Sequence, residues 1–168
     1  MRWPFGRQDK MRPLPTVVLT EDEQRECQDH WRAMTQAPEG HYGAIREDLL
    51  DSFQRWVVGD CLMGRAERFL ILCNSQPEYK EQACQAAAKA CAVFPVFIYW
   101  YDFACVLKQV GKRADAKQMF REFLRRHELE TADPMMQLIL NQRDVEAAVQ
   151  HARDEIQTPQ GRNSARAR

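Results

Sequence analysis

The sequence predicts an all-α fold of antiparallel helical hairpins, stacked as a short solenoid or packed as a compact bundle. Apolar residues recur at the spacing of amphipathic helices along most of the 168 residues. The seven Gly and eight Pro stand mainly between these periodic segments, so the connections are short and neighbouring helices should run antiparallel. One segment, Thr16–Thr20 ("TVVLT"), has the composition of a strand.

The first helix is expected over residues 20–36. Its start carries the sequence "TEDE", in which Thr20 and Glu23 can each accept a hydrogen bond from the backbone N–H of the other, an arrangement called a capping box. Further helices are expected at 44–58, 61–74 and 77–92, then between Pro95 and Gly111, after Gly111, and finally at 134–142 and 144–157.

Three helix boundaries rest on local signals. Gly59 is expected to end the 44–58 helix. Ser75 or Gln76 should cap the helix expected at 77–92. Pro77 then lies in the first turn of this helix, where its missing N–H has no cost. The sequence "ADP" gives a similar start signal, with Asp133 as the cap.

The zero net charge conceals basic ends on an acidic body. Residues 1–15 carry four basic side chains against one acidic, a net charge of +3, and residues 157–168 carry three Arg and no acid, again +3. We therefore expect a flexible basic N-terminal arm over residues 1–19, a helical domain over 20–157 and a disordered basic tail over 158–168. Such arms are either solvated ends or contacts for nucleic acid, anionic lipid or an acidic partner.

The cysteines and the apolar runs favour a cytoplasmic protein. No two of the six Cys have the Cys-x-x-Cys spacing of zinc or thioredoxin-type sites. The first 15 residues contain no apolar stretch typical of a secretory signal. The most apolar run, residues 90–101, is shorter than the roughly 20 residues of a transmembrane helix. We expect reduced thiols and no transmembrane segment.

No catalytic or cofactor motif is found. The sequence lacks a phosphate-binding Gly-rich loop, Gly-x-Ser-x-Gly and His-Glu-x-x-His. Two pairs stand four residues apart, Glu26 with His30 and His151 with Glu155. Either could supply two metal ligands, but a site needs three or four, and surface ion pairs are the more common result. We therefore predict no enzyme activity, no metal site and no cofactor.

One segment resembles a known repeat. Large and small residues alternate there in the pattern of a tetratricopeptide repeat: Trp100, Phe103, Ala104, Leu107, Gly111, Ala116, Phe120 and Phe123. The pattern makes Ala104 and Ala116 the small residues where two helices cross, and Gly111 the turn between them. There are departures, because Arg113 replaces a usual Tyr, Phe123 a usual Ala and Glu128 a frequent Pro.

The resemblance is strong in one unit, at about 97–127, and weaker in the flanking ones. Ala148 matches Ala116 at an offset of 32 residues, close to the family period of about 34. An upstream helix near 77–94 could belong to a preceding unit in uncertain register. The resemblance covers roughly residues 62–157 and implies a tetratricopeptide-like α-solenoid, although a compact helical bundle stays open.

The resemblance also implies a binding groove lined by the first helix of each unit. In the strong unit it places these residues on that face: Ile98, Tyr101, Cys105, Lys108 and Gln109. Tyr101 and Cys105 replace the polar residues with which the family clamps C-terminal carboxylates, so an apolar or aromatic anchor from a partner is expected instead. The stripe of Ile98, Tyr101 and Cys105 could equally be covered by the neighbouring hairpin.

These features together predict a protein–protein interaction module. It would act as a scaffold, adaptor or accessory subunit that binds a protein partner, or a larger complex, through a helical groove. The alternative is a nucleic-acid-associated accessory protein that uses its basic terminal arms.

Overall fold

The computed structural model confirms the all-α prediction. It describes residues 17–36, 50–129 and 144–158, and within these ranges every regular element is a helix. The helices are α1 (Glu21–Gln36), α2 (Leu50–Leu72), α3 (Tyr79–Val93), α4 (Phe97–Gln109), α5 (Arg113–Leu129) and α7 (Val145–Gln157). The strand-like segment was misread, because its residues 17–20 have no regular structure.

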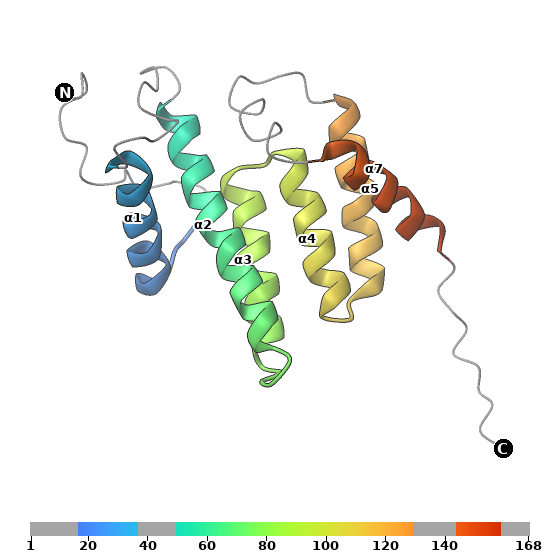
Figure 1. The fold of residues 1–168 in the computed structure, drawn as a ribbon, viewed down its shortest axis with the longest axis horizontal. Coiled ribbons are helices and arrows are strands. Elements are labelled where there is room, and N and C mark those ends of the chain that lie inside the picture. The colour runs from blue at the N-terminus through green and yellow to red at the C-terminus, as the bar shows by residue number, and fades with distance from the viewer. Residues whose placement is uncertain (1–16, 37–49, 130–143, 159–168) are drawn as a thin grey trace.

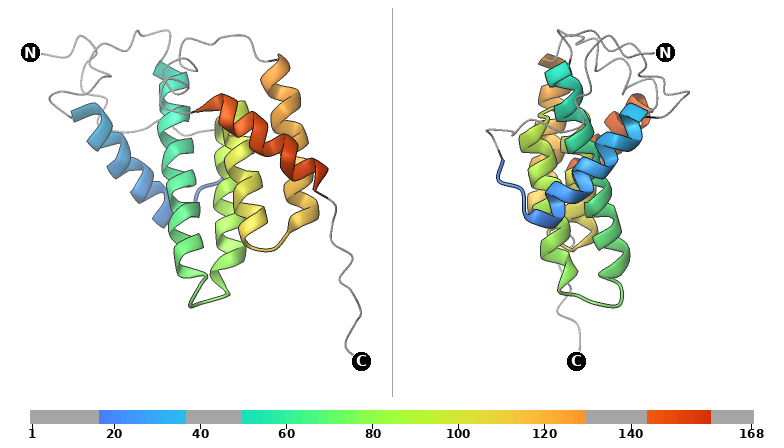
Figure 2. Two further views of the ribbon diagram at one scale, coloured as in Figure 1. Left: turned by 45° about the vertical axis from the view of Figure 1, so that its right-hand side comes forward. Right: turned by 90° about the vertical axis from the view of Figure 1, so that its left-hand side faces the viewer.

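Two antiparallel hairpins form the centre of the molecule. Helices α2 and α3 pair closely, as do α4 and α5, and the hairpins lie side by side through contacts of α4 with α3 and α2 (Figure 1). Helix α1 packs against α2 at one end of this row. Helix α7 runs diagonally across the α4–α5 hairpin at the other end (Figure 2).

The capping box at the start of α1 is confirmed. The Thr20 N–H donates to Glu23 Oε2 at 2.8 Å, and the Glu23 N–H donates to Thr20 Oγ1 at 3.3 Å. These bonds satisfy two N–H groups that have no partner inside the helix. The chain therefore enters α1 where the sequence alone predicted.

Gly59 does not end a helix, contrary to the prediction. Helix α2 continues through it as one 23-residue element. A Cβ atom at Gly59 would lie 2.6 Å from Tyr99 Cε2 and 3.2 Å from Phe94 Cβ. The glycine is thus the point where the ring of Tyr99 packs against the backbone of α2.

The predicted cap of α3, Ser75 or Gln76, was also wrong. Helix α3 begins at Tyr79, and the residue before it, Glu78, makes no side-chain capping bond. Ser75 serves the end of α2 instead, because its N–H and its hydroxyl both donate to the Leu72 carbonyl, at 3.0 and 3.1 Å. Ser75 therefore belongs to the end of α2, four residues before α3 begins, and α3 has no side-chain cap.

The turn between α4 and α5 follows the prediction. Gly111 has a φ of +91°, a conformation that residues with a Cβ rarely adopt. The N–H of Lys112 donates to Leu107 O at 2.8 Å and that of Gly111 to Lys108 O at 3.1 Å, which is a Schellman motif. Ala104 and Ala116 are both buried where the helices meet.

The start of α7 agrees with the expected helix at 144–157. Asp144 caps it, because its Oδ1 accepts from the Ala147 N–H at 2.9 Å. The expected helix at 134–142 and the Asp133 cap lie outside the described residues, as do most of the predicted basic arm and tail.

The core runs along the row of helices. Its fully buried large side chains come from several elements: Phe53, Val57, Val58 and Leu62 of α2, Ile98 and Tyr99 of α4, and Phe120 and Phe123 of α5. Helix α3 contributes small side chains, Ala83, Ala86, Ala87 and Ala90, which let its neighbours approach closely. Among the described helices, none is both long and apolar enough to cross a bilayer.

One ion pair ties the start of α1 to α3. Lys89 Nζ lies 2.6 Å from Glu23 Oε2, and Glu23 is only 6% exposed. Burial raises the pKa of Glu23, but the hydrogen bond from Lys89 and the capping bonds from Thr20 outweigh it and leave this pKa below the ordinary value. The pair therefore stabilises the fold above the unfolded-state pKa of about 4.3, and this stabilisation is lost as the pH falls through the folded-state value.

Replacement of Lys89 by methionine is expected to lower the free energy of unfolding by about 1–3 kcal/mol at pH 7, because a buried carboxylate loses its cation. The deficit should shrink as the pH falls through the lowered folded-state pKa of Glu23, because the protonated carboxyl no longer needs a cation. Urea denaturation at several pH values measures this. Lys80→Met, at an exposed position of the same helix, is the control. A Lys89→Met deficit that does not change with pH would contradict the assignment.

Candidate functional site

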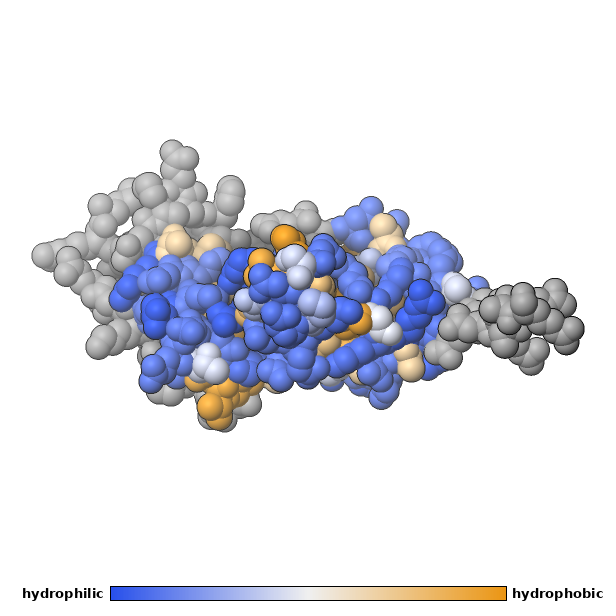
Figure 3. All heavy atoms as spheres, turned by 90° about the horizontal axis from the view of Figure 1, so that it is seen from below, coloured by the Kyte–Doolittle hydropathy of each residue, from blue (hydrophilic) through white to orange (hydrophobic). Residues whose placement is uncertain are grey.

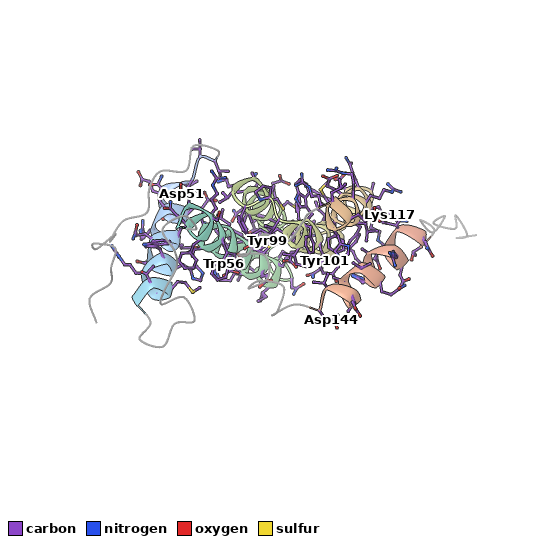
Figure 4. The ribbon with its side chains drawn as sticks, turned by 90° about the horizontal axis from the view of Figure 1, so that it is seen from above. Asp51, Trp56, Tyr99, Tyr101, Lys117 and Asp144 are labelled. Atoms are coloured by element: carbon purple, nitrogen blue, oxygen red, sulfur yellow. The ribbon has the colours of Figure 1, made fainter. Side chains whose placement is uncertain are left out.

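Tyr101 stands at the centre of the face that α7 covers. The centroid of its ring lies 5.9 Å from that of Phe120 and 5.3 Å from that of Phe123, so Tyr101 packs against α5 on one side. From the α7 side, the His151 ring lies at 5.7 Å, and its Nδ1 is 2.9 Å from the Tyr101 hydroxyl. Figure 4 shows Tyr101 between the α4–α5 hairpin and α7.

Two lysines hold the C-terminal half of α7. Lys108 Nζ donates to Glu155 Oε1 at 2.9 Å, and this bond is the main reason that the pKa of Glu155 lies below its ordinary value. Lys117 of α5 donates to the Ile156 carbonyl at 3.3 Å and also to the Thr158 carbonyl (Figure 4). A cation at these carbonyls also suits the negative end of the helix dipole.

Small side chains make the apolar part of this contact. Ala148 and Ala152 are the buried residues of α7, one turn apart on the side that faces the hairpin. Val145, Val149 and Ile156 are only partly buried. The α4–α5 face therefore holds a helix through two alanines, one imidazole and one carboxylate.

The five predicted groove residues do not share one environment. Tyr101 and Lys108 contact α7. Cys105 lies beside Tyr101, half-buried, and burial raises the pKa of its thiol to about 11. Ile98 is 1% exposed and belongs to the core in this arrangement, whereas Gln109 is exposed at the end of α4.

The two Glu–His pairs of the sequence have different partners. His151 and Glu155 form the expected i,i+4 contact, with Nε2 and Oε1 3.7 Å apart, which is an ion pair when the imidazole is protonated. Glu26 instead contacts Arg65 and Arg68 of α2, and His30 contacts Asp60. Within the described part of the chain, no group of three or more His, Cys, Asp or Glu side chains is placed to hold a metal ion.

No protein-family model, no curated protein and no solved structure matches this chain. The resemblance to tetratricopeptide repeats therefore stays a prediction from the residue pattern.

Sequence reasoning missed the role of α7. It matched Ala148 to Ala116 in a weaker flanking repeat unit and said nothing of contacts with the strong unit, whereas α7 crosses the α4–α5 hairpin and contacts both of its helices. The signal was present in part, because Ala148, His151, Ala152 and Glu155 lie on one helix face. Nothing in the sequence says which neighbour that face meets.

Seen from below, the surface is mostly hydrophilic, with small hydrophobic areas (Figure 3). The exposed apolar side chains include Ile71 and Leu72 at the end of α2 and Leu129 at the end of α5. Such single exposed residues are ordinary on protein surfaces. The α4–α5 face under α7 is the better candidate for recognition.

Proposed function

We propose that this chain is a non-enzymatic interaction module, an adaptor or accessory subunit, which binds a helix of a partner protein on the α4–α5 face around Tyr101. The observation that carries this proposal is that the face already holds a helix, α7. The contacts of α7 are simple for a partner to reproduce: small residues one turn apart, a hydrogen-bonding group for Tyr101 and a carboxylate for Lys108.

A partner helix would take the place of α7. Release of α7 exposes little apolar surface of its own, because its buried side chains are two alanines. It uncovers an aromatic face on the hairpin, where Tyr101 lies over Phe120 and Phe123. Aromatic side chains in such positions often carry much of an interface's binding free energy.

We also infer that the hairpin row is a tetratricopeptide-like stack in the cytoplasm. The consecutive packing of α2–α3 against α4–α5, and the fit of the repeat pattern to α4 and α5, support the first inference. The inference of a cytoplasmic location rests on the six cysteines, which are all free thiols.

The test compares variants on both sides of the contact. Tagged full-length protein captures its partner from the native cells, and the affinity of the purified pair is then measured. Tyr101→Glu should weaken binding at least tenfold, since it places a charge on the aromatic face. His151→Ala loosens α7 without altering the hairpin, so it should strengthen partner binding several-fold.

Controls separate these effects from unfolding. Gln150→Ala changes an exposed position of α7 and should leave affinity unchanged. Circular dichroism and thermal melts check that each variant is folded. Unchanged affinity in both folded variants, Tyr101→Glu and His151→Ala, would refute binding at this face.

A second candidate function rests on charge alone. Each terminus carries a net +3, which suits an accessory protein that contacts nucleic-acid phosphates. Removal of residues 1–15 and 159–168 should abolish salt-sensitive nucleic-acid binding and leave binding at the α4–α5 face intact. If nucleic-acid binding survives this truncation, the basic terminal arms are not the nucleic-acid contact.

A further inference from the structure

Two cysteines from different helices meet at the α1–α2 interface. Two contacts between α1 and α2 flank them: Glu26, next to Cys27, binds Arg65, and Asp60, next to Cys61, binds His30. This packing brings the two thiols together, and each shifts the pKa of the other. Cys27 is fully buried, whereas Cys61 is partly exposed. Thirty-three residues separate them in the sequence, so the pair exists only in the folded chain.

Charged groups surround this pair on both helices. His30 Nε2 lies 3.1 Å from Asp60 Oδ2, next to Cys61 in the chain, and this hydrogen bond raises the pKa of His30. Glu26 on α1 is engaged by Arg65 at 2.5 Å and by Arg68 at 2.7 Å. The negative charge of Glu26 near the thiols is thus partly neutralised.

Cys61 differs from the other thiols in this environment. Its pKa lies below the ordinary value because the Cys27 thiol donates a hydrogen bond to it; burial opposes this shift, and the charges of His30 and Arg68 assist it. Burial raises the pKa of Cys91 to about 12 and also raises that of Cys84. Partly exposed thiols that ionise readily beside a second thiol are typical of oxidation-sensitive sites.

We propose that Cys27 and Cys61 are a hydroperoxide-sensitive dithiol that closes to a disulfide between α1 and α2. Cys61 is the residue attacked first, because it is the partly exposed one. Cys27 is the resolving residue, since it is already in contact with Cys61 and shielded from solvent.

The chemistry proceeds in two steps. The Cys61 thiolate attacks one oxygen of hydrogen peroxide and the O–O bond breaks; Cys61 becomes a sulfenic acid, and the departing hydroxide takes a proton to form water. The Cys27 sulfur then attacks the sulfenic sulfur, the S–O bond breaks, and the hydroxyl leaves as water with the Cys27 proton. Overall, two thiols and one peroxide give one disulfide and two waters, and the two electrons lost by the thiols reduce the peroxide.

Oxidation would fasten α1 to the hairpin row covalently. An S–S bond is about 2.05 Å long, so the two helices must draw together at this point. The link closes a loop that contains residues 37–49 and resists separation of α1 from α2.

The experiment uses the reduced full-length protein and hydrogen peroxide. Peptide mapping of the wild type should show a Cys27–Cys61 linked peptide, and the intact mass should fall by two hydrogens. Cys27→Ser should stop at the sulfenic acid on Cys61, which dimedone traps. Cys73→Ser, which removes another partly exposed thiol, should still form the link.

Replacement of His30 by glutamine should slow the oxidation of Cys61 several-fold. The melting temperature of this variant is measured as well, because a purely structural role of His30 would not slow oxidation in a variant that is as stable as the wild type. The proposal is overturned if peroxide yields no Cys27–Cys61 peptide in the folded wild type. It is equally overturned if Cys61 is oxidised no faster than Cys73. The wild-type map decides the question even if a serine variant fails to fold.

Discussion

Replacement of Phe123 by alanine is expected to lower the free energy of unfolding by about 3–5 kcal/mol. Phe123 is 0% exposed, and its ring lies 5.9 Å from that of Phe97 and 5.3 Å from that of Tyr101. The substitution removes a large apolar side chain and leaves a cavity between α4 and α5, whose residues Phe97, Tyr101 and His127 surround the ring. Most domains are stable by only about 5–15 kcal/mol, so much of the stability would be lost.

Urea denaturation measures this effect, and the midpoint should fall by more than about 1 M. Leu129→Ala is the control, because Leu129 is on the same helix but 66% exposed, and a change within about 0.5 kcal/mol is expected. A Phe123→Ala variant that unfolds at the wild-type urea concentration would contradict the packing of Phe123 against Phe97 and Tyr101.

Replacement of Gly59 by alanine is expected to destabilise the protein, although alanine is the better helix former. The new Cβ would meet Tyr99 Cε2 at 2.6 Å, and Tyr99 is 2% exposed and cannot move aside. Overpacking of this kind costs about 1–3 kcal/mol, against a gain in helix propensity of about 0.5–1 kcal/mol. A net loss of about 1–2 kcal/mol should remain.

Gly64→Ala provides a matched control in the same helix. A Cβ there would lie 3.8 Å from Arg68 Nη1, an ordinary contact, so the gain in helix propensity should appear as a stabilisation of about 0.5–1 kcal/mol. The same substitution five residues apart should thus change stability in opposite directions. A stabilising effect of Gly59→Ala in thermal and urea unfolding would contradict the close contact between the Tyr99 ring and the backbone of α2 at Gly59.

Features that depend on a few consecutive residues could be predicted from the sequence. The capping box of Thr20 and Glu23 and the turn at Gly111 are such features, because their hydrogen bonds join groups at most five residues apart. The all-α fold and the burial of Ala104 and Ala116 follow from apolar periodicity, which is also local. These features establish where α1 and α5 begin, and which side of a helix is buried.

Features that depend on distant residues could not be predicted in this way. Gly59 is a breaker by its type, but Tyr99, forty residues away, makes it a packing point within one long helix. Ile98 and Tyr101 form one apolar stripe in the sequence, yet one is core and the other meets α7.

The candidate site follows the same division. The sequence by itself determined the all-α architecture and drew attention to Tyr101 and Lys108. Only the tertiary structure decided that α7 covers them, and that Cys27 meets Cys61. The physical reason is that a side chain's spacing fixes its face on a helix, whereas the packing of all the helices together fixes what that face touches.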